Sequence, residues 1–265
     1  MHAFAYHRPQ TSKDAISLAA KNHEGKYLAG GQSLVQAMKL RLASPTDLID
    51  LNAIGDLKTL KADGNSVTIG AMVRHAEVAA SSAVQKAIPA LATLAGMIGD
   101  RQVRHMGTLG GSLANSDPAA DYPAAVVGLG ATIVTNKRKI EGDKYFKGLF
   151  ETALEPGELI TAVTFPAPKR AAYMKFKNPA SRFALVGVFV ADFGGNVRVG
   201  VTGAGPCAFR QADMEKALSA KFAPESVAGI KVKPDGLNGD LHASPEYRAH
   251  LVTVMAKRAV EAALK

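Results

Sequence analysis

The chain has one cysteine and no tryptophan among its 265 residues. A lone Cys207 excludes an internal disulfide, a CxxC redox pair and an iron–sulfur cluster ligated by cysteines of this chain. Any such cluster would belong to a partner. Aromatic residues make up only 6% of the sequence, which disfavours the stacking surfaces typical of proteins that bind single-stranded nucleic acid.

Long apolar runs are also missing. No stretch approaches the roughly 20 residues that cross a bilayer, and the first six residues lack the charged-then-apolar order of a secretory signal. The sequence therefore predicts a folded cytoplasmic protein without a membrane span.

Clusters of charge and of metal ligands are sparse as well. The net charge is +9, but the 32 Lys and Arg residues are scattered, and the densest cluster, residues 136–139, is short. This pattern favours a solvated turn or a partner surface over a nucleic-acid interface. The seven histidines form neither an HExxH nor an HxH pattern, so no metal site is expected.

The length and the pattern of apolar residues predict two compact units of mixed helix and strand. The stretch from Pro166 to Pro168 is the best boundary, because prolines remove strand hydrogen-bond donors and the composition turns polar there. Ser33 and Gln36 are expected to form a capping box. Helices are expected over residues 11–21, 34–42, 74–80, 84–98, 124–129, 209–220 and 245–264, and strands over 26–29, 47–51, 57–62, 66–71, 131–134, 159–165, 172–177, 183–193 and 197–202.

Two glycine-bearing loops lie about eighty residues apart, Ala29-Gly30-Gly31-Gln32-Ser33-Leu34 and Thr108-Leu109-Gly110-Gly111-Ser112. Paired glycines tolerate positive φ and lack Cβ atoms, so backbone N–H groups can turn toward a pyrophosphate. The first loop has neither the lysine of a P-loop nor the three glycines of GxGxxG, and by itself it is also explained as a structural turn. Together the loops predict a site for one dinucleotide cofactor.

Hydroxyl and acidic residues surround the second loop. Thr108 and Ser112 can donate to phosphate oxygens, and Asp121 can accept from ribose hydroxyls. Asp117 has two interpretations, a ligand contact or an Asx-type turn that begins a helix at Pro118.

These loops, together with residues 49–51, 67–71 and 117–121, resemble the FAD-binding medium subunit of the molybdenum hydroxylases. That family includes the carbon monoxide dehydrogenase medium chain and the flavin domain of xanthine dehydrogenase. The resemblance covers nearly the whole chain and implies an α+β fold. Residues 1–168 would form an FAD-binding domain of the vanillyl-alcohol-oxidase (PCMH) type, in subdomains of about 1–55 and 56–168. Residues 169–265 would form a C-terminal domain of the carbon monoxide dehydrogenase flavoprotein type, with a three-stranded antiparallel sheet and helices.

The resemblance also implies which residues hold FAD. Both loops would contact the pyrophosphate, Asp121 a polar part of the cofactor, and Ile160 and Lys177 the surroundings of the flavin ring. A lysine there would favour the negative charge that accumulates on reduction, although Lys177 is equally explained as a solvated strand residue. The implied set contains no catalytic residue and no metal ligand, and it comprises Leu28, Ala29, Gly30, Gly31, Gln32, Ser33, Leu34, Ile98, Thr108, Leu109, Gly110, Gly111, Ser112, Asp121, Ile160 and Lys177.

Three positions depart from the family pattern. His105 and Ser112 stand where the family commonly has asparagine. Phe183 stands where related chains often carry a tyrosine near the isoalloxazine, and it is also explained as a core residue. We expect cofactor binding to survive these changes and redox tuning to differ.

By resemblance, the chain is expected to be an electron-transfer flavoprotein subunit. Its FAD would accept electrons from [2Fe-2S] clusters on a small partner subunit and pass them to an external acceptor. The substrate would be hydroxylated at the molybdenum cofactor of a large subunit, in a heterotrimer that often forms a dimer of heterotrimers. The alternative is a stand-alone flavin oxidase or reductase, which would need a catalytic Ser or Tyr near a Glu in residues 169–265, and the sequence has no recognisable arrangement of this kind.

Overall fold

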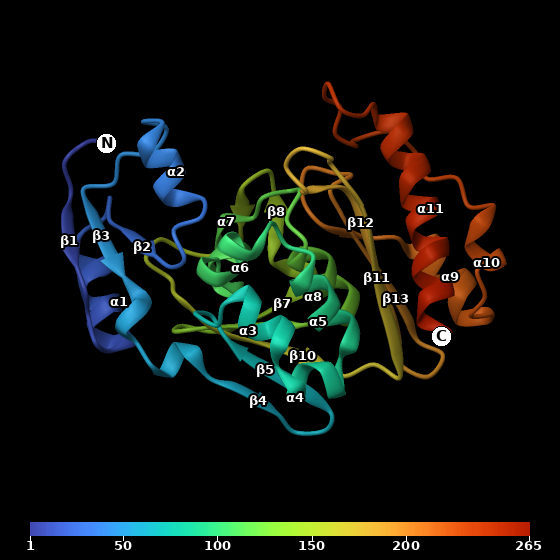
Figure 1. The fold of residues 1–265 in the computed structure, drawn as a ribbon, viewed down its shortest axis with the longest axis horizontal. Helices are drawn as coiled ribbons and strands as arrows, with labels where there is room; N and C mark the ends of the chain where they lie inside the picture. The colour runs from blue at the N-terminus through green and yellow to red at the C-terminus, as the bar shows by residue number, and fades with distance from the viewer.

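The computed structural model describes all 265 residues, and three parts of the chain follow one another across the molecule (Figure 1). The N-terminal part is a parallel sheet in the order β1-β3-β2, formed by Ala5–His7, Asp47–Asp50 and Lys26–Leu28. Helix α1 (Ser12–Lys21) begins at Thr11, whose hydroxyl accepts a hydrogen bond from the N–H of Asp14 at 3.1 Å. The sequence predicts this helix and two of these three strands.

Helix α2 (Leu34–Lys39) is shorter than the sequence predicts, and the predicted capping box is wrong. Ser33 has helical backbone angles, φ −112° and ψ −54°, and its side chain caps no N–H group. N-cap side chains usually reach the first turn from an extended backbone, so this conformation prevents the bond. The N–H groups that enter α2 are consequently left without a cap.

The central part contains an antiparallel sheet in the order β4-β5-β10-β6-β7. Its strands are Leu60–Ala62, Ser66–Gly70, Ile160–Pro166, Thr132–Thr135 and Lys139–Glu141. Six helices accompany it: α3 (His75–Ala80), α4 (Ser82–Ala87), α5 (Pro89–Gly96), α6 (Arg101–Met106), α7 (Leu109–Asn115) and α8 (Tyr122–Leu129). A short hairpin of β8 (Phe146–Gly148) and β9 (Glu151–Thr152) and three 3-10 turns, Leu51–Ala53, Asp56–Lys58 and Gly142–Lys144, complete the first two parts.

The expected single helix over residues 84–98 is divided into α4 and α5. The break lies at Ile88, whose φ of −142° and ψ of 73° leave the helical region immediately before Pro89. The proline ring disfavours a helical conformation in the preceding residue and cannot donate an N–H, so the chain restarts with Pro89 in the first turn of α5. Gly130, by contrast, adopts φ +63° at the end of α8 and gives the predicted break before β6.

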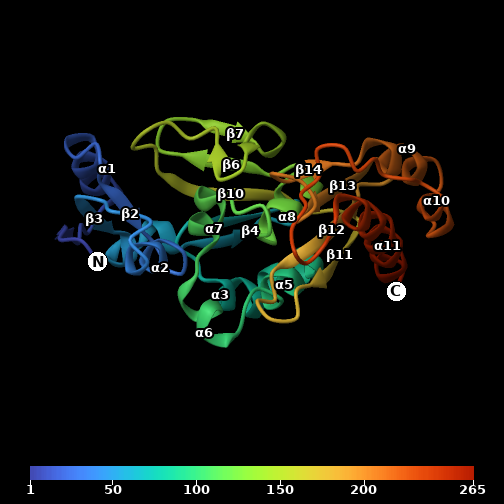
Figure 2. The same cartoon turned by 90° about the horizontal axis from the view of Figure 1, so that it is seen from above.

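The C-terminal part is an antiparallel sheet covered by helices on both faces (Figure 2). The three predicted long strands are β11 (Arg170–Lys177), β12 (Ala184–Asp192) and β13 (Val197–Thr202), and a two-residue strand, β14 (Phe209–Arg210), extends the sheet to four. Helices α9 (Ala212–Ala220), α10 (Glu225–Ala228) and α11 (Pro245–Ala263) pack on one side, while α8 and α5 lie against the sheet from the central part. Every residue of β12 is therefore buried.

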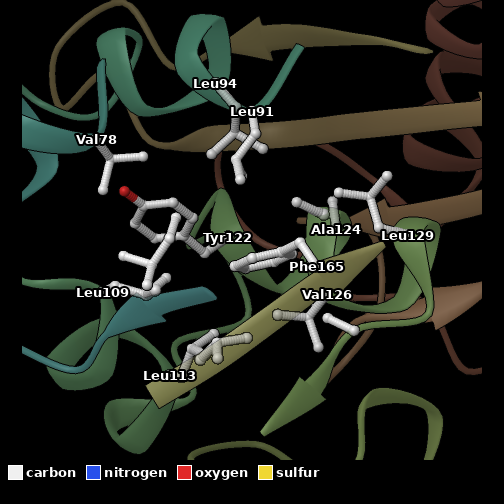
Figure 3. Close-up of a cluster of buried hydrophobic side chains, with 14 of the residues drawn as sticks. Val78, Leu91, Leu94, Leu109, Leu113, Tyr122, Ala124, Val126, Leu129 and Phe165 are labelled. Carbon is white, nitrogen blue, oxygen red and sulfur yellow. The ribbon is translucent and has the colours of Figure 1, made fainter. Parts of the chain in front are cut away.

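The core of the central part is built around α7, α8 and β10 (Figure 3). Tyr122 of α8 is fully buried between Leu109 of α7 and Leu91 of α5, and Phe165 of β10 lies beside it. Burying a side chain of this size contributes about 1.5–3 kcal/mol relative to exposing it. This core holds α7 rigidly, and with it the glycine loop at its start.

Candidate cofactor site

A cavity of about 530 Å³ lies where the three parts meet, within the range of small-molecule sites. The N-terminal part contributes the loop at residues 29–34, and the central part contributes the second glycine loop and the residues near Asp121. The C-terminal part contributes residues 181–183, which connect β11 to β12. A ligand in this cavity would touch all three parts of the chain.

The two glycine loops pack directly against each other at this cavity. A Cβ atom on Gly30 would lie 2.7 Å from the Cα of Gly107 and would overlap the carbonyl oxygen of Met106. A Cβ on Gly111 would lie 3.3 Å from the Cβ of Ala29. The atoms that face Gly30 belong to the backbone, and Gly111 faces the Ala29 methyl group, so side chains at Gly30 and Gly111 would force these segments apart.

The two loops differ in whether their backbone N–H groups have hydrogen-bond acceptors within the chain. None of the five N–H groups from Gly30 to Leu34 has a hydrogen-bond acceptor within the chain. In the second loop the N–H groups of residues 109–112 are already bonded, to Val73 and Ala71 carbonyls and to the backbone and hydroxyl of Thr108. The expectation that both loops offer amides is therefore wrong for residues 109–112, and in the second loop only the N–H of Thr108 has no acceptor within the chain.

Unpaired N–H groups in a turn form a concave site for an anion. Gly31, at φ +71°, provides the left-handed turn that bends this segment. The second loop contributes close approach through its glycines and a hydroxyl through Ser112. The arrangement fits a diphosphate held mainly by backbone amides of the first loop.

A chain of hydrogen bonds holds the first loop in place. The Asn52 side-chain amide donates to the carbonyl of Ala29 at 3.1 Å and to the carboxylate of Asp50 at 2.7 Å. The hydroxyl of Tyr6 donates to the other oxygen of Asp50 at 2.5 Å. No sequence pattern indicates this role for Asn52, because its partner Ala29 lies 23 residues away along the chain.

Asp121 lines the inner wall of the cavity and is only 4% exposed. Its Oδ1 accepts a hydrogen bond from the hydroxyl of Tyr173 at 2.5 Å, and the ammonium group of Lys175 lies 2.9 Å from both carboxylate oxygens. Burial raises the pKa of Asp121, against the opposing effects of Lys175 and Tyr173. Both partners belong to β11, so the C-terminal part supports this wall of the cavity.

His75 and Glu158 both line the cavity and differ in their charge at pH 7. Burial and the nearby Arg104 lower the pKa of His75 to about 4, so its imidazole is neutral at pH 7. Glu158 stays ionised: although burial raises its pKa, hydrogen bonds from Arg138, the Glu155 amide and Thr135 lower it to about 2. The cavity thus holds a fixed negative charge at Glu158 and none at His75.

Comparison with known proteins identifies the family of this chain. Residues 2–168 match the family described as the FAD binding domain in molybdopterin dehydrogenase. The chain belongs to this family. The FAD-binding chain is similar to the carbon monoxide dehydrogenase medium chain of Afipia carboxidovorans, with 34% identity over 278 residues that cover 98% of this chain and 96% of the relative.

Another relative and a solved structure support the same family assignment. The nicotine 6-hydroxylase medium subunit of Paenarthrobacter nicotinovorans is 35% identical over 274 residues, which cover 97% of this chain and 96% of that subunit. A chain of the reconstituted CO dehydrogenase from Oligotropha carboxidovorans superposes with a TM-score of 0.91 at 33% identity, covering 99% of this chain and 98% of that one. The relatives are subunits of oxidoreductases, and the predicted family and fold class are confirmed.

The structure gathers most of the predicted site residues of the FAD-binding chain around the cavity. Three of them do not line it. Leu28 lies in β2, Leu109 is fully buried in the core (Figure 3), and Lys177 is exposed at the end of β11. The residues that do line it are Ala29, Gly30, Gly31, Gln32, Ser33, Leu34, Ile98, Thr108, Gly110, Gly111, Ser112, Asp121 and Ile160.

The structure also shows where Asp117, Phe183 and His105 lie relative to the cavity. Asp117 forms the Asx turn, accepting a hydrogen bond from the N–H of Ala119 at 2.8 Å, and also lines the cavity, but no helix begins at Pro118. Phe183 lines the cavity with 48% of its surface exposed, so its interpretation as a core residue is wrong. His105 is exposed on α6 and does not line the cavity.

Sequence reasoning missed several residues of the site: His75, Glu158, Tyr173, Lys175 and Arg182. Lys175 had a signal, because it lies two residues before Lys177 on the same predicted strand. Tyr173 and Lys175 lie two residues apart on β11 and so point to the same face, which packs against Asp121, while the register shift beside Lys177 leaves Leu185 of β12 unpaired. Lys175 is therefore buried behind Asp121, whereas Lys177 faces solvent.

Proposed function

We propose that this chain is the electron-transfer subunit of a molybdenum hydroxylase, with FAD held in the cavity between its three parts. The observation that carries the proposal is the row of five unpaired N–H groups from Gly30 to Leu34, packed against the second glycine loop. Backbone amides suit a diphosphate because they donate hydrogen bonds without a side chain in the way. No helix of the chain is long and apolar enough to cross a membrane.

Residues of the cavity wall would hold the rest of the cofactor. We propose that the first loop binds the pyrophosphate and that Ser112 donates to it from the second loop. Asp121 would accept from hydroxyl groups of the cofactor, and Ile98 and Ile160 would pack beside it. We keep Leu28, Leu109 and Lys177 in the proposed set only as neighbours, since they do not line the cavity.

The division of the chain follows from the same proposal. The FAD-binding domain would span residues 1–168 and the C-terminal domain residues 169–265. The C-terminal domain would still take part in binding, because Ser181 and Phe183 lie at the cavity and Lys175 supports Asp121.

Bound FAD would allow electrons to pass between carriers that transfer one electron and carriers that transfer two. We propose that electrons reach it from [2Fe-2S] clusters on a small partner subunit, and that the substrate is hydroxylated at the molybdenum cofactor of a large subunit. This chain cannot ligate a cluster with its single cysteine, Cys207, and its relatives are medium chains and subunits of larger enzymes. The assembly would be a heterotrimer, paired into a dimer of heterotrimers.

The purified chain tests the cofactor assignment. We expect it to carry visible flavin absorbance, or to regain it when the apoprotein is mixed with FAD, at about one FAD per chain. A folded chain that cannot be reconstituted would refute the assignment. FMN is the matched control ligand, because it lacks the diphosphate bridge and the adenylate, and we expect it to bind much more weakly.

Isolation of the tagged chain from its native host tests the partners. We expect a small cysteine-rich chain and a large chain to accompany it, with iron and molybdenum in the sample. A yellow chain that elutes alone and oxidises a substrate unaided would instead support the stand-alone oxidase.

A further inference from the structure

The wall of the cavity contains an ion pair that is completely withdrawn from solvent. The side chain of Lys175 is 1% exposed and that of Asp121 is 4% exposed. Besides contacting the carboxylate, the ammonium group donates to the carbonyl of Met97 at 3.2 Å, next to Ile98 in the cavity wall. One lysine from β11 therefore joins two separate segments of the cavity wall.

Stability alone does not account for a pair of this kind. Removing two charges from water costs several kcal/mol per ion, and apolar residues of similar volume often serve the fold as well. Strongly perturbed charged groups beside a cleft are candidates for a functional role. Lys175 shares its face of β11 with Tyr173, which also contacts Asp121, whereas Lys177 at the end of the strand is exposed.

The carboxylate of Asp121 has acceptor capacity left over. An ionised carboxylate offers about four lone-pair positions, and the partners of the Asp121 carboxylate within the chain are Tyr173 and Lys175. Because Asp121 also lines the cavity, a free acceptor position is available to a ligand there. A protonated carboxyl would instead offer a donor and fewer acceptors.

We propose that Lys175 is a positioning residue of the cofactor site: its ammonium group bridges the Asp121 carboxyl and the Met97 carbonyl and holds the carboxyl in place, so that Asp121 accepts hydrogen bonds from hydroxyl groups of the bound dinucleotide. This inference rests on the proposed binding of FAD. It assigns the supporting cation to Lys175 of the C-terminal part.

Other ionisable groups around Asp121 also have shifted pKa values. Tyr173 and Tyr122 have pKa values raised by burial, so neither ionises near neutral pH. Burial and Arg104 lower the pKa of His75 to about 4, and Glu158 titrates near 2. Asp117 is the remaining cavity carboxyl, and burial raises its pKa.

The test is the affinity of the full-length apoprotein for FAD, measured by quenching of flavin fluorescence between pH 6 and pH 8.5. We expect Lys175→Arg, which keeps the charge, to show the same dependence of affinity on pH as the wild type, and Lys175→Met to show a steeper one. In Lys175→Met the opposing charge is gone, so burial raises the pKa of Asp121 further and the carboxyl takes up a proton as the pH falls. Binding should then weaken by up to about tenfold per pH unit below that pKa.

Matched variants assign the effect. Lys169→Met, an exposed lysine just before β11, should bind like the wild type at every pH. Adding Asp117→Asn to Lys175→Met should leave the pH slope in place, because Asp121 is the titrating group. If Lys175→Met does not fold, Lys175→Gln keeps an N–H donor for the Met97 carbonyl and should show the same slope.

Two results would overturn the inference. Unchanged affinity in Lys175→Met would show that the lysine has no role in binding, and uniformly weaker affinity without a steeper pH slope would show a structural role only. Failure of the wild-type chain to bind FAD at all would refute the proposed function instead, so the two failures are distinguishable.

Discussion

The contact between Gly30 and the second loop makes the sharpest prediction. In Gly30→Ala the new Cβ atom would lie 2.6 Å from the carbonyl carbon of Met106 and 2.7 Å from the Cα of Gly107, both of them backbone atoms. The Cβ would also overlap the carbonyl oxygen of Met106, and ordinary van der Waals contact begins near 3.4 Å, so the first loop must retreat by about an ångström. Its free N–H groups retreat with it.

The expected loss follows from hydrogen bonding to a charged ligand. One such bond contributes about 1.5–3 kcal/mol. Losing one of them from the diphosphate corresponds to roughly 10- to 150-fold weaker FAD binding. The assay is titration of the apoprotein with FAD, followed by flavin fluorescence.

Gly55→Ala is the matched control, because a Cβ atom there would meet nothing within 4 Å and Gly55 has a φ of −71°. Urea unfolding without FAD shows whether both variants are folded. Equal FAD affinity in the two variants, with both folded, would refute the proposal that the first loop binds the diphosphate.

Three other predictions concern the second loop, the core and acid stability. Gly111→Val should lose FAD retention, measured as bound flavin after gel filtration, because its Cβ would lie 3.3 Å from the Cβ of Ala29, and normal retention would contradict this contact. Leu91→Ala should lower the unfolding free energy in urea by about 2–5 kcal/mol, whereas Leu42→Ala, at a position 79% exposed, should change it little. The pKa of His75 is lowered to about 4, so the unfolded chain binds a proton there first and the wild type loses up to about 3 kcal/mol as the pH falls from 6.5 to 4; in His75→Phe this loss should disappear from urea midpoints measured across that range.

Local patterns made much of the fold predictable. Thr11 and Ser244 begin helices α1 and α11 with side chains that accept from backbone N–H groups, as such residues commonly do. Gly130 breaks the chain between a buried helix and a strand. Ser33 looked like an equally good N-cap in the sequence, but its backbone angles are set by the loop that precedes α2, and no cap forms.

The candidate site was predictable only in part, because it also depends on contacts that residue type does not reveal. The two glycine loops could be recognised from their residue composition. Their resemblance to a known family predicted FAD as the ligand. Which N–H groups remain free depends on partners elsewhere, since Ala71 and Val73 of the central part take the amides of the second loop. Leu109, although inside the loop motif, points into the core because α7 packs on β10 and α8 (Figure 3).

The sequence by itself determined that this chain has two glycine loops, few candidates for metal or disulfide chemistry, and helices and strands in a mixed order, because these properties depend on residue type and on short-range spacing. Only the tertiary structure decided that the loops touch, that all five N–H groups from Gly30 to Leu34 stay free while those of residues 109–112 are bonded, and that Lys175 rather than Lys177 stands behind Asp121. These outcomes depend on contacts between residues 50 or more positions apart, which short-range patterns do not encode.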